Sequence, residues 1–168
     1  SEQDYPPYPY RVWTRQFGSD RIDKGHGVAV SATGEVYVAG SIDGDGDSEW
    51  YYDESDLLLQ KLSPGGDPTW SRRWGSGNED YAYDVVVAPS GRIYVCGATH
   101  GSFDGEPHPS NERRFCLSAF TQSGSRPWSE IWGGVSIDVA HSLALAPGGD
   151  IYVGGRTWNS LTGQETFN

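Results

Sequence analysis

One stretch recurs three times along the chain, and this repeat limits the folds that are open to it. Each copy contains two short apolar runs around a turn with glycine, a pattern typical of a β-hairpin. The copies lie about 57 residues apart, and a period of this size indicates a propeller, a solenoid or another repeat array. They occupy residues 23–40, 80–97 and 138–155.

A second pair of predicted strands follows each of the first two hairpins. These pairs lie at 56–62 with 69–74 and at 115–120 with 127–132. No segment shows sustained helical periodicity, so each unit is expected to contain four short antiparallel strands. Four such strands form a propeller blade. The fold class predicted here is therefore all-β, with β-propeller-type blades. A periodic tryptophan in each unit is expected to lie in the core: Trp13, Trp70 and Trp128.

Three motifs of the units are Gly-Ser-Gly-Asn-Glu-Asp-Tyr-Ala at 75–82, Gly-Glu-Val-Tyr-Val-Ala-Gly at 34–40 and Asp-Leu-Leu-Leu-Gln-Lys-Leu at 56–62. In these motifs the units resemble the β-propeller repeats found in large bacterial surface and secreted proteins, known as SBBP repeats. The resemblance covers about residues 13 to 158, and it departs from the pattern at Arg114 and Ala119, which replace Asp56 and Lys61 of the first unit. It implies a propeller fold but no particular activity, because propellers host many functions.

The predicted blades do not complete a ring. Propellers have four or more blades, whereas about three fit here, so two sheet edges would stay open. We expect these edges to be covered by other copies of the chain or by another protein; alternatively, the chain is a fragment of a longer propeller. The predicted parts are a Pro/Tyr-rich arm at 1–10, a partial propeller at 11–158 made of an orphan strand at 11–18, blades at 21–75 and 78–133 and a partial blade at 135–158, and a tail at 159–168.

The charge balance restricts the possible partners. Acidic residues outnumber basic ones 23 to 12, for a net charge of −11. This balance disfavours nucleic acid and anionic membrane surfaces as partners. No run approaches the roughly 20 apolar residues of a spanning helix, so no direct membrane insertion is expected. An extracellular, cell-surface or periplasmic location is compatible with these features and with the resemblance.

An acidic loop after the first hairpin is the strongest candidate for binding a metal. Aspartates alternate with glycines there, which lets the backbone curl so that carboxylates converge on a hard cation such as Ca²⁺. Position 6 of the loop is Ser48 rather than glycine, and strands rather than helices flank it, so an EF-hand is excluded. The alternatives are a free-standing calcium loop and a solvated acidic loop. The candidate ligands are Asp43, Asp45, Asp47, Glu49, Asp53 and Glu54.

Two cysteines, Cys96 and Cys116, lie near facing ends of successive predicted strands. A disulfide between them would indicate an oxidising compartment. Alternatively, they are two small buried apolar residues, because the matching positions in other units are core-like.

Acids and histidines also recur at fixed positions of the unit. Such an acid at a strand entrance is expected to bind turn amides, since a catalytic role seldom needs three equivalent copies. The histidines His26 and His141, with Tyr83 at the equivalent position between them, could contribute to a metal site or could pack between blades. The recurring acids are Asp23, Asp80 and Asp138.

Aromatic residues in the loops could stack on sugar rings, although tryptophan and tyrosine are also enriched at protein interfaces. No nucleophile elbow, phosphate loop or dinucleotide fingerprint occurs. The sequence therefore favours a non-enzymatic structural, adhesive or assembly module, with a lectin-like propeller and a fragment of a propeller hydrolase as alternatives. The loop aromatics are Trp50, Tyr51, Tyr52 and Trp158.

Overall fold

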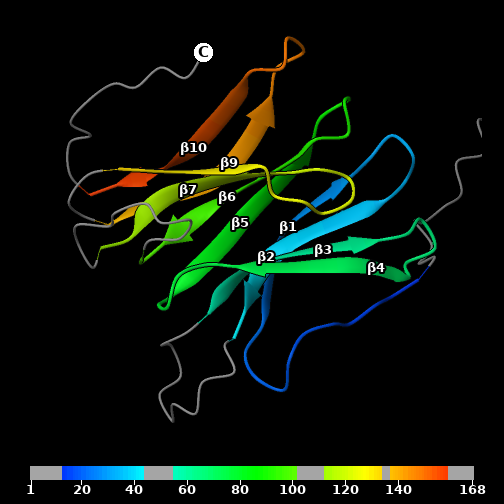
Figure 1. Cartoon of the computed structure of the whole chain (residues 1–168), viewed down its shortest axis with the longest axis horizontal. Helices are drawn as coiled ribbons and strands as arrows, with labels where there is room; N and C mark the ends of the chain where they lie inside the picture. The colour runs from blue at the N-terminus through cyan, green and yellow to red at the C-terminus, as the bar shows by residue number, and fades with distance from the viewer. Residues whose placement is uncertain (1–12, 44–54, 102–111, 134–136, 159–168) are drawn as a thin grey trace, which may run out of the picture.

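The structure is a computed structural model that describes residues 13–43, 55–101, 112–133 and 137–158 (Figure 1). These residues form ten β-strands and no helix, and accordingly no helix that could cross a membrane. The strands are β1 (Lys24–Val30), β2 (Val36–Ile42), β3 (Asp56–Leu62), β4 (Pro68–Trp74), β5 (Asp80–Val87), β6 (Ile93–Thr99), β7 (Arg114–Phe120), β8 (Trp128–Trp132), β9 (Asp138–Leu145) and β10 (Ile151–Thr157).

The strands form three antiparallel sheets whose order follows the sequence. Two sheets have four strands, β1-β2-β3-β4 and β5-β6-β7-β8, and the third has only β9 and β10. Figure 1 shows the three sheets one after another across the molecule, with β5 and β6 in the middle. This arrangement confirms the predicted all-β fold with four-stranded, propeller-type blades.

The first hairpin of each sheet closes through the same tight turn. A glycine with positive φ lies at this turn in every copy: Gly34, Gly91 and Gly149, with φ of 85°, 81° and 99°. Only glycine adopts such a conformation without steric cost, which explains why the turn residue repeats in the sequence. The serine or alanine that begins each turn accepts a hydrogen bond from this glycine.

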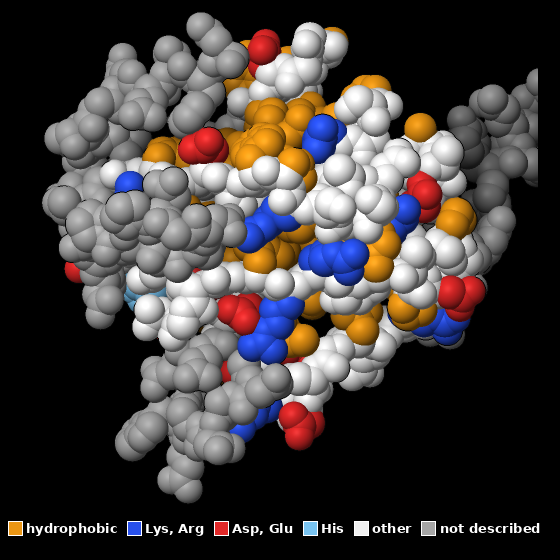
Figure 2. All heavy atoms as spheres, in the orientation of Figure 1, with side chains coloured by type: hydrophobic (Ala, Val, Ile, Leu, Met, Phe, Trp, Pro, Cys, Tyr) orange, Lys and Arg blue, Asp and Glu red, His pale blue; other side chains and the backbone are white. Residues whose placement is uncertain are grey.

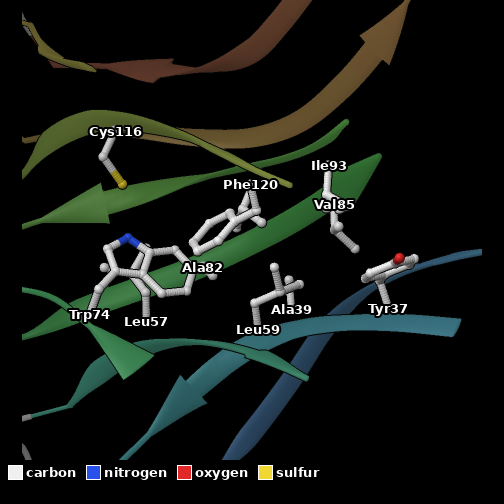
Figure 3. Close-up of a cluster of buried hydrophobic side chains, with 11 residues drawn as sticks. Tyr37, Ala39, Leu57, Leu59, Trp74, Ala82, Val85, Ile93, Cys116 and Phe120 are labelled. Atoms are coloured by element: carbon white, nitrogen blue, oxygen red, sulfur yellow. The ribbon is translucent and has the colours of Figure 1, made fainter. Parts of the chain in front are cut away.

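The first two sheets pack face to face through a hydrophobic cluster (Figure 3). Leu57 and Leu59 of β3 meet Val95 and Phe120 of the second sheet in this cluster. Trp74 of β4 packs edge-on against Phe120, with ring centroids 4.8 Å apart, and its Nε1 donates a hydrogen bond of 3.1 Å to Ser118 Oγ. The buried indole is therefore satisfied in both its apolar and its polar parts.

A second, smaller cluster joins the second sheet to the two-stranded sheet. Phe115 and Leu117 of β7 lie there with Cys96, Ala140 and Leu143. Each sheet thus depends on its neighbour for burial of its faces, as in any repeat array in which one unit cannot bury its apolar face alone.

Of the two alternatives for the cysteines, the structure has two buried core residues and no disulfide. Cys96 and Cys116 are both free and buried. Cys116 is paired in register with Gly97, so the neighbouring Cys96 points to the opposite face of the sheet. Cys116 belongs to the cluster facing the first sheet and Cys96 to the cluster facing the third. Burial raises the pKa of Cys96 to about 12 and that of Cys116 well above its ordinary value, as expected of core thiols.

Residues 13–18, the described part of the predicted orphan strand at 11–18, form no ladder with another strand. A strand needs a neighbour with which to form a ladder, and no other strand of that blade belongs to the described chain. The segment is instead held by side chains, as shown below.

Candidate functional site

The first strand of each sheet carries a β-bulge at the same place. In β5, Ala82 pairs with Gly97 and Asp84 pairs with Cys96, which leaves Tyr83 as the extra residue. The same register shifts occur between Gly25 and Gly27 of β1 and opposite Gly154 and Gly155 of β10, and they leave two histidines as the extra residues: His26 and His141. A bulge redirects a side chain out of the ladder, so three aromatic rings are redirected in the same way.

These three rings form a row across the first strands of the three sheets. The ring centroids of His26 and Tyr83 lie 5.1 Å apart, and those of Tyr83 and His141 lie 5.0 Å apart. Partial burial, and after it the charge of Lys24, lowers the pKa of His26. The described residues hold no group of three side chains suited to a metal ion. The geometry is that of aromatic packing between neighbouring sheets.

Glycines on the second strands make room for these bulges. A Cβ on Gly40 would clash with the backbone carbonyl of Lys24, and a Cβ on Gly97 would clash with that of Tyr81. Gly155 stands in the same relation to Val139. The periodic glycine at the end of each repeat therefore permits close backbone approach.

The recurring aspartates bind backbone amides beside the first strand. Asp80 is fully buried and accepts hydrogen bonds from the amides of Ser76 and His100, the second at 3.3 Å. Asp23 accepts equivalent bonds from Ser19 and Asp43, the second at 3.1 Å. Burial is the main cause that raises the pKa of Asp80 to about 6, against the opposing hydrogen bonds of Thr99 and Ser76. Asp138 occupies the matching position and is fully buried.

A tryptophan and an arginine of one unit bind the turn between the third and fourth strands of the next unit. We call this contact the Trp-Arg latch. Trp70 Nε1 donates 3.0 Å to the carbonyl of Gln122, and Arg72 Nε donates 2.7 Å to the carbonyl of Gly124. The guanidinium of Arg72 also lies over the Trp70 ring, with its carbon 5.2 Å from the ring centroid.

The same latch occurs at the start of the described chain. Trp13 Nε1 donates 3.2 Å to the carbonyl of Pro64, and Arg15 Nε donates 2.8 Å to that of Gly66. Arg15 also pairs with Asp67 at 2.8 Å. Residues 13–17 thus stand where the fourth strand of a preceding blade would stand.

The third copy of the latch has no turn to bind among the described residues. Its tryptophan, Trp128, is 39% exposed, and the position of the arginine is taken by the exposed Glu130. Tyr152 of β10 is 61% exposed, whereas the equivalent Tyr37 of β2 is fully buried beside Trp70. Figure 2 shows hydrophobic side chains at the surface over the sheet of β9 and β10. Trp128 and Glu130 on β8, together with Tyr152 on β10, therefore form an exposed surface that is called here the C-terminal open face.

The other end of the array also has an open face, on β1. Val28 is 67% exposed, although the equivalent Val85 of β5 is only 2% exposed because it packs against the first sheet. Val30 is exposed as well. We call this the N-terminal open face.

Most of the predicted ligand and loop residues lie outside the described part of the chain. Asp43 directly follows β2, and Trp158 follows β10 with 66% of its surface exposed. The predicted residues outside the described ranges are Asp45, Asp47, Glu49, Asp53 and Glu54 of the acidic loop and Trp50, Tyr51 and Tyr52 of the aromatic group.

Sequence reasoning missed the latch arginines. Arg15 and Arg72 each follow a periodic tryptophan by two residues, and this spacing was the available signal. Glu130 breaks that pattern at the third copy, which made the contact hard to see from sequence alone.

Comparisons with known proteins agree with this architecture. Residues 12–47, which include the Trp13 segment and the first hairpin, match the family model described as beta-propeller repeat, SBBP. A second similarity is to the regulatory protein FlaEY of Caulobacter vibrioides, 28% identical over 147 residues. The match covers 80% of this chain but only 15% of that relative. Together with the sheet architecture, the family match shows that this chain carries a β-propeller repeat of the SBBP family.

Proposed function

We infer that this chain is a non-enzymatic assembly module: a segment of a β-propeller that works when further blades join its open faces. The observation that carries this proposal is the contrast between equivalent positions. Tyr37 is fully buried between the first two sheets and beside Trp70 of β4, and Tyr152 is 61% exposed where no described strand or sheet follows β10.

The open faces support this proposal energetically. Burying one large apolar side chain contributes about 1.5–3 kcal/mol. Val28 and Val30 at one end and Tyr152 at the other are left without that contribution in the described chain. Contiguous exposed apolar residues on a soluble protein mark interaction sites.

The similarity to a much longer regulatory protein also favours a module that works within a larger assembly, since the match spans only 15% of that relative. The acidic charge of −11 would keep such a module away from nucleic acid. An extracellular or cell-surface location remains part of the proposal through the resemblance to surface repeats.

Sedimentation velocity combined with binding of the dye ANS tests this function. The proposal predicts that the isolated chain either associates or binds ANS at its exposed apolar faces. A monodisperse monomer of 18.4 kDa that binds no ANS would contradict it. The Val28→Ser variant should reduce dye binding, while Thr14→Ser, at an exposed polar position, serves as the matched control.

We also propose that the acidic loop beginning at Asp43 binds Ca²⁺. Its support is the alternation of carboxylates with glycines in the sequence and the placement of Asp43 directly after β2, with its amide held by Asp23. Calorimetric titration with calcium, with and without a chelator, tests this idea. Absence of heat at millimolar calcium would contradict it, and Asp45→Asn should weaken binding while Asp104→Asn, in the equivalent loop of the next unit, should not.

A further inference from the structure

The Trp-Arg latch shows what chemistry each unit offers to the next. In both complete copies the tryptophan and the arginine donate hydrogen bonds to backbone carbonyls of a turn. At the first turn the arginine adds an ion pair with Asp67, and at the second it adds a bond of 3.2 Å to the carbonyl of Ser123. The latch is therefore a cationic donor that meets carbonyl or carboxylate acceptors.

The third copy carries a negative side chain where the first two copies carry a positive one. Glu130 stands in the place of Arg15 and Arg72, and it is exposed on β8. A carboxylate accepts hydrogen bonds and donates none. A turn that suits Arg72 would place carbonyl oxygens against Glu130, which is unfavourable.

The turn between β3 and β4 of this chain is poorly suited to pack against Trp128 and Glu130 of a second copy. It carries Asp67, which would repel Glu130, and its carbonyls at Pro64 and Gly66 already bind Trp13 and Arg15. A second copy would have to release its own Trp13 segment and then accept a like charge. Charge complementarity thus favours another occupant over the first blade of a second copy.

We propose that the C-terminal open face receives the third and fourth strands of a blade whose connecting turn carries a basic side chain at the position of Asp67. This proposal rests on the assembly function above and names the partner's chemistry. The incoming third strand pairs with β10 and covers Tyr152, as β3 pairs with β2 beside Tyr37. The turn of the incoming hairpin accepts a hydrogen bond from Trp128 Nε1, and the basic side chain of that turn forms an ion pair with Glu130.

Two synthetic hairpin peptides provide the probe. Both have the sequence of residues 56–74, the third and fourth strands of the first blade, closed into a ring to hold the hairpin. One keeps Asp67, and the other carries Asp67→Lys. Calorimetry measures the binding of each peptide to the full chain at low and at high salt.

The lysine peptide is expected to bind the full chain about three- to tenfold more tightly than the aspartate peptide, with a difference that shrinks in salt. In the full-chain variant Glu130→Arg, the preference should reverse. Asp20→Arg makes the same charge change at an exposed position that precedes β1 and should leave the preference as it is. Because Glu130 and Asp20 are exposed, both variants should fold, and circular dichroism checks this.

Three outcomes overturn the proposal. Equal binding of the two peptides, with no change in Glu130→Arg, shows that charge does not select the partner, although a hairpin still completes the blade. Tighter binding of the aspartate peptide indicates that a second copy is the better occupant. Binding of neither peptide excludes this face as the receiving site, while the sedimentation and dye experiment decides separately whether the assembly function holds.

Discussion

The first blade and the sheet of β9 and β10 contain the same hairpin, yet they differ in how much of it is buried. Tyr37 and Tyr152 occupy equivalent positions and are 0% and 61% exposed. The difference lies in what covers them. Tyr37 packs in the cluster between the first two sheets and beside Trp70 of β4, whereas no described strand or sheet follows β10. The local sequence is thus enough to form a hairpin, but its burial depends on the strands and the sheet that follow it.

The largest effect should come from removing the two equivalent tyrosines. Tyr37→Ala is expected to lower the free energy of unfolding by about 3–5 kcal/mol, because it opens a cavity between the first two sheets. Tyr152→Ala should lower it by less than about 0.5 kcal/mol. Urea denaturation measures the free energy of unfolding of both variants. Equal losses of stability would contradict the difference in burial between the two tyrosines.

The bulge glycines should give the next largest effect. Gly97→Ala is expected to cost about 2–3 kcal/mol, because a Cβ there meets the carbonyl of Tyr81 in a strand that is paired on both sides. Gly155→Ala should cost less, since β10 has a neighbour on one side only and can shift. Gly77→Ala, where a Cβ meets no atom within 4 Å, is the control. Thermal unfolding measures all three, and a larger cost at Gly155 than at Gly97 would contradict this account.

The Trp-Arg latch offers a third comparison between a covered position and an open one. Arg72→Ala should cost about 1–2 kcal/mol, through its lost hydrogen bond to Gly124 and its lost contact with Trp70. Glu130→Ala at the equivalent open position should have almost no effect on the isolated chain. Chemical denaturation of the two variants tests this, and similar losses would show that the third copy is already occupied.

The smallest expected effect is the pH dependence caused by Asp80. Its pKa in the folded protein is about 6, above the ordinary value of 3.8, so the folded state takes up a proton as the pH falls between these values. Stability contributed by this group therefore rises as the pH falls through 6. Relative to Asp80→Asn, the wild type should gain about 1 kcal/mol between pH 7 and pH 5. Denaturation at both pH values measures this gain, and a relative loss at pH 5 would reverse the assigned sign.

The sequence predicted those features that are set within one unit. The hairpins, the turn glycines and the four-stranded sheets follow from patterns that lie close together in the chain. Of the two alternatives for Cys96 and Cys116, the structure has the buried core residues and not the disulfide, because the two side chains lie on opposite faces of the sheet, which their spacing does not reveal. Residues 13–18 of the predicted orphan strand form no ladder because its partner strands are not in the described chain, although residues 13–17 lie where a fourth strand would lie.

Contacts between units were harder to predict. The Trp70 and Arg72 donors meet a turn about 52 residues away, and only the packing of one sheet on the next brings them together. The calcium loop remains a prediction, since all of its candidate ligands except Asp43 lie outside the described residues.

Hydrogen exchange tests the central claim most directly, because it compares β6 (Ile93–Thr99) with its equivalent β10 (Ile151–Thr157) in the isolated chain. Amides of β6 have ladder partners on both sides, whereas those of β10 pair with β9 alone. We predict that β10 exchanges much faster than β6 and becomes protected when the lysine hairpin is added. Equal protection of the two strands in a monomeric chain without added peptide would contradict the claim that this blade is completed from outside.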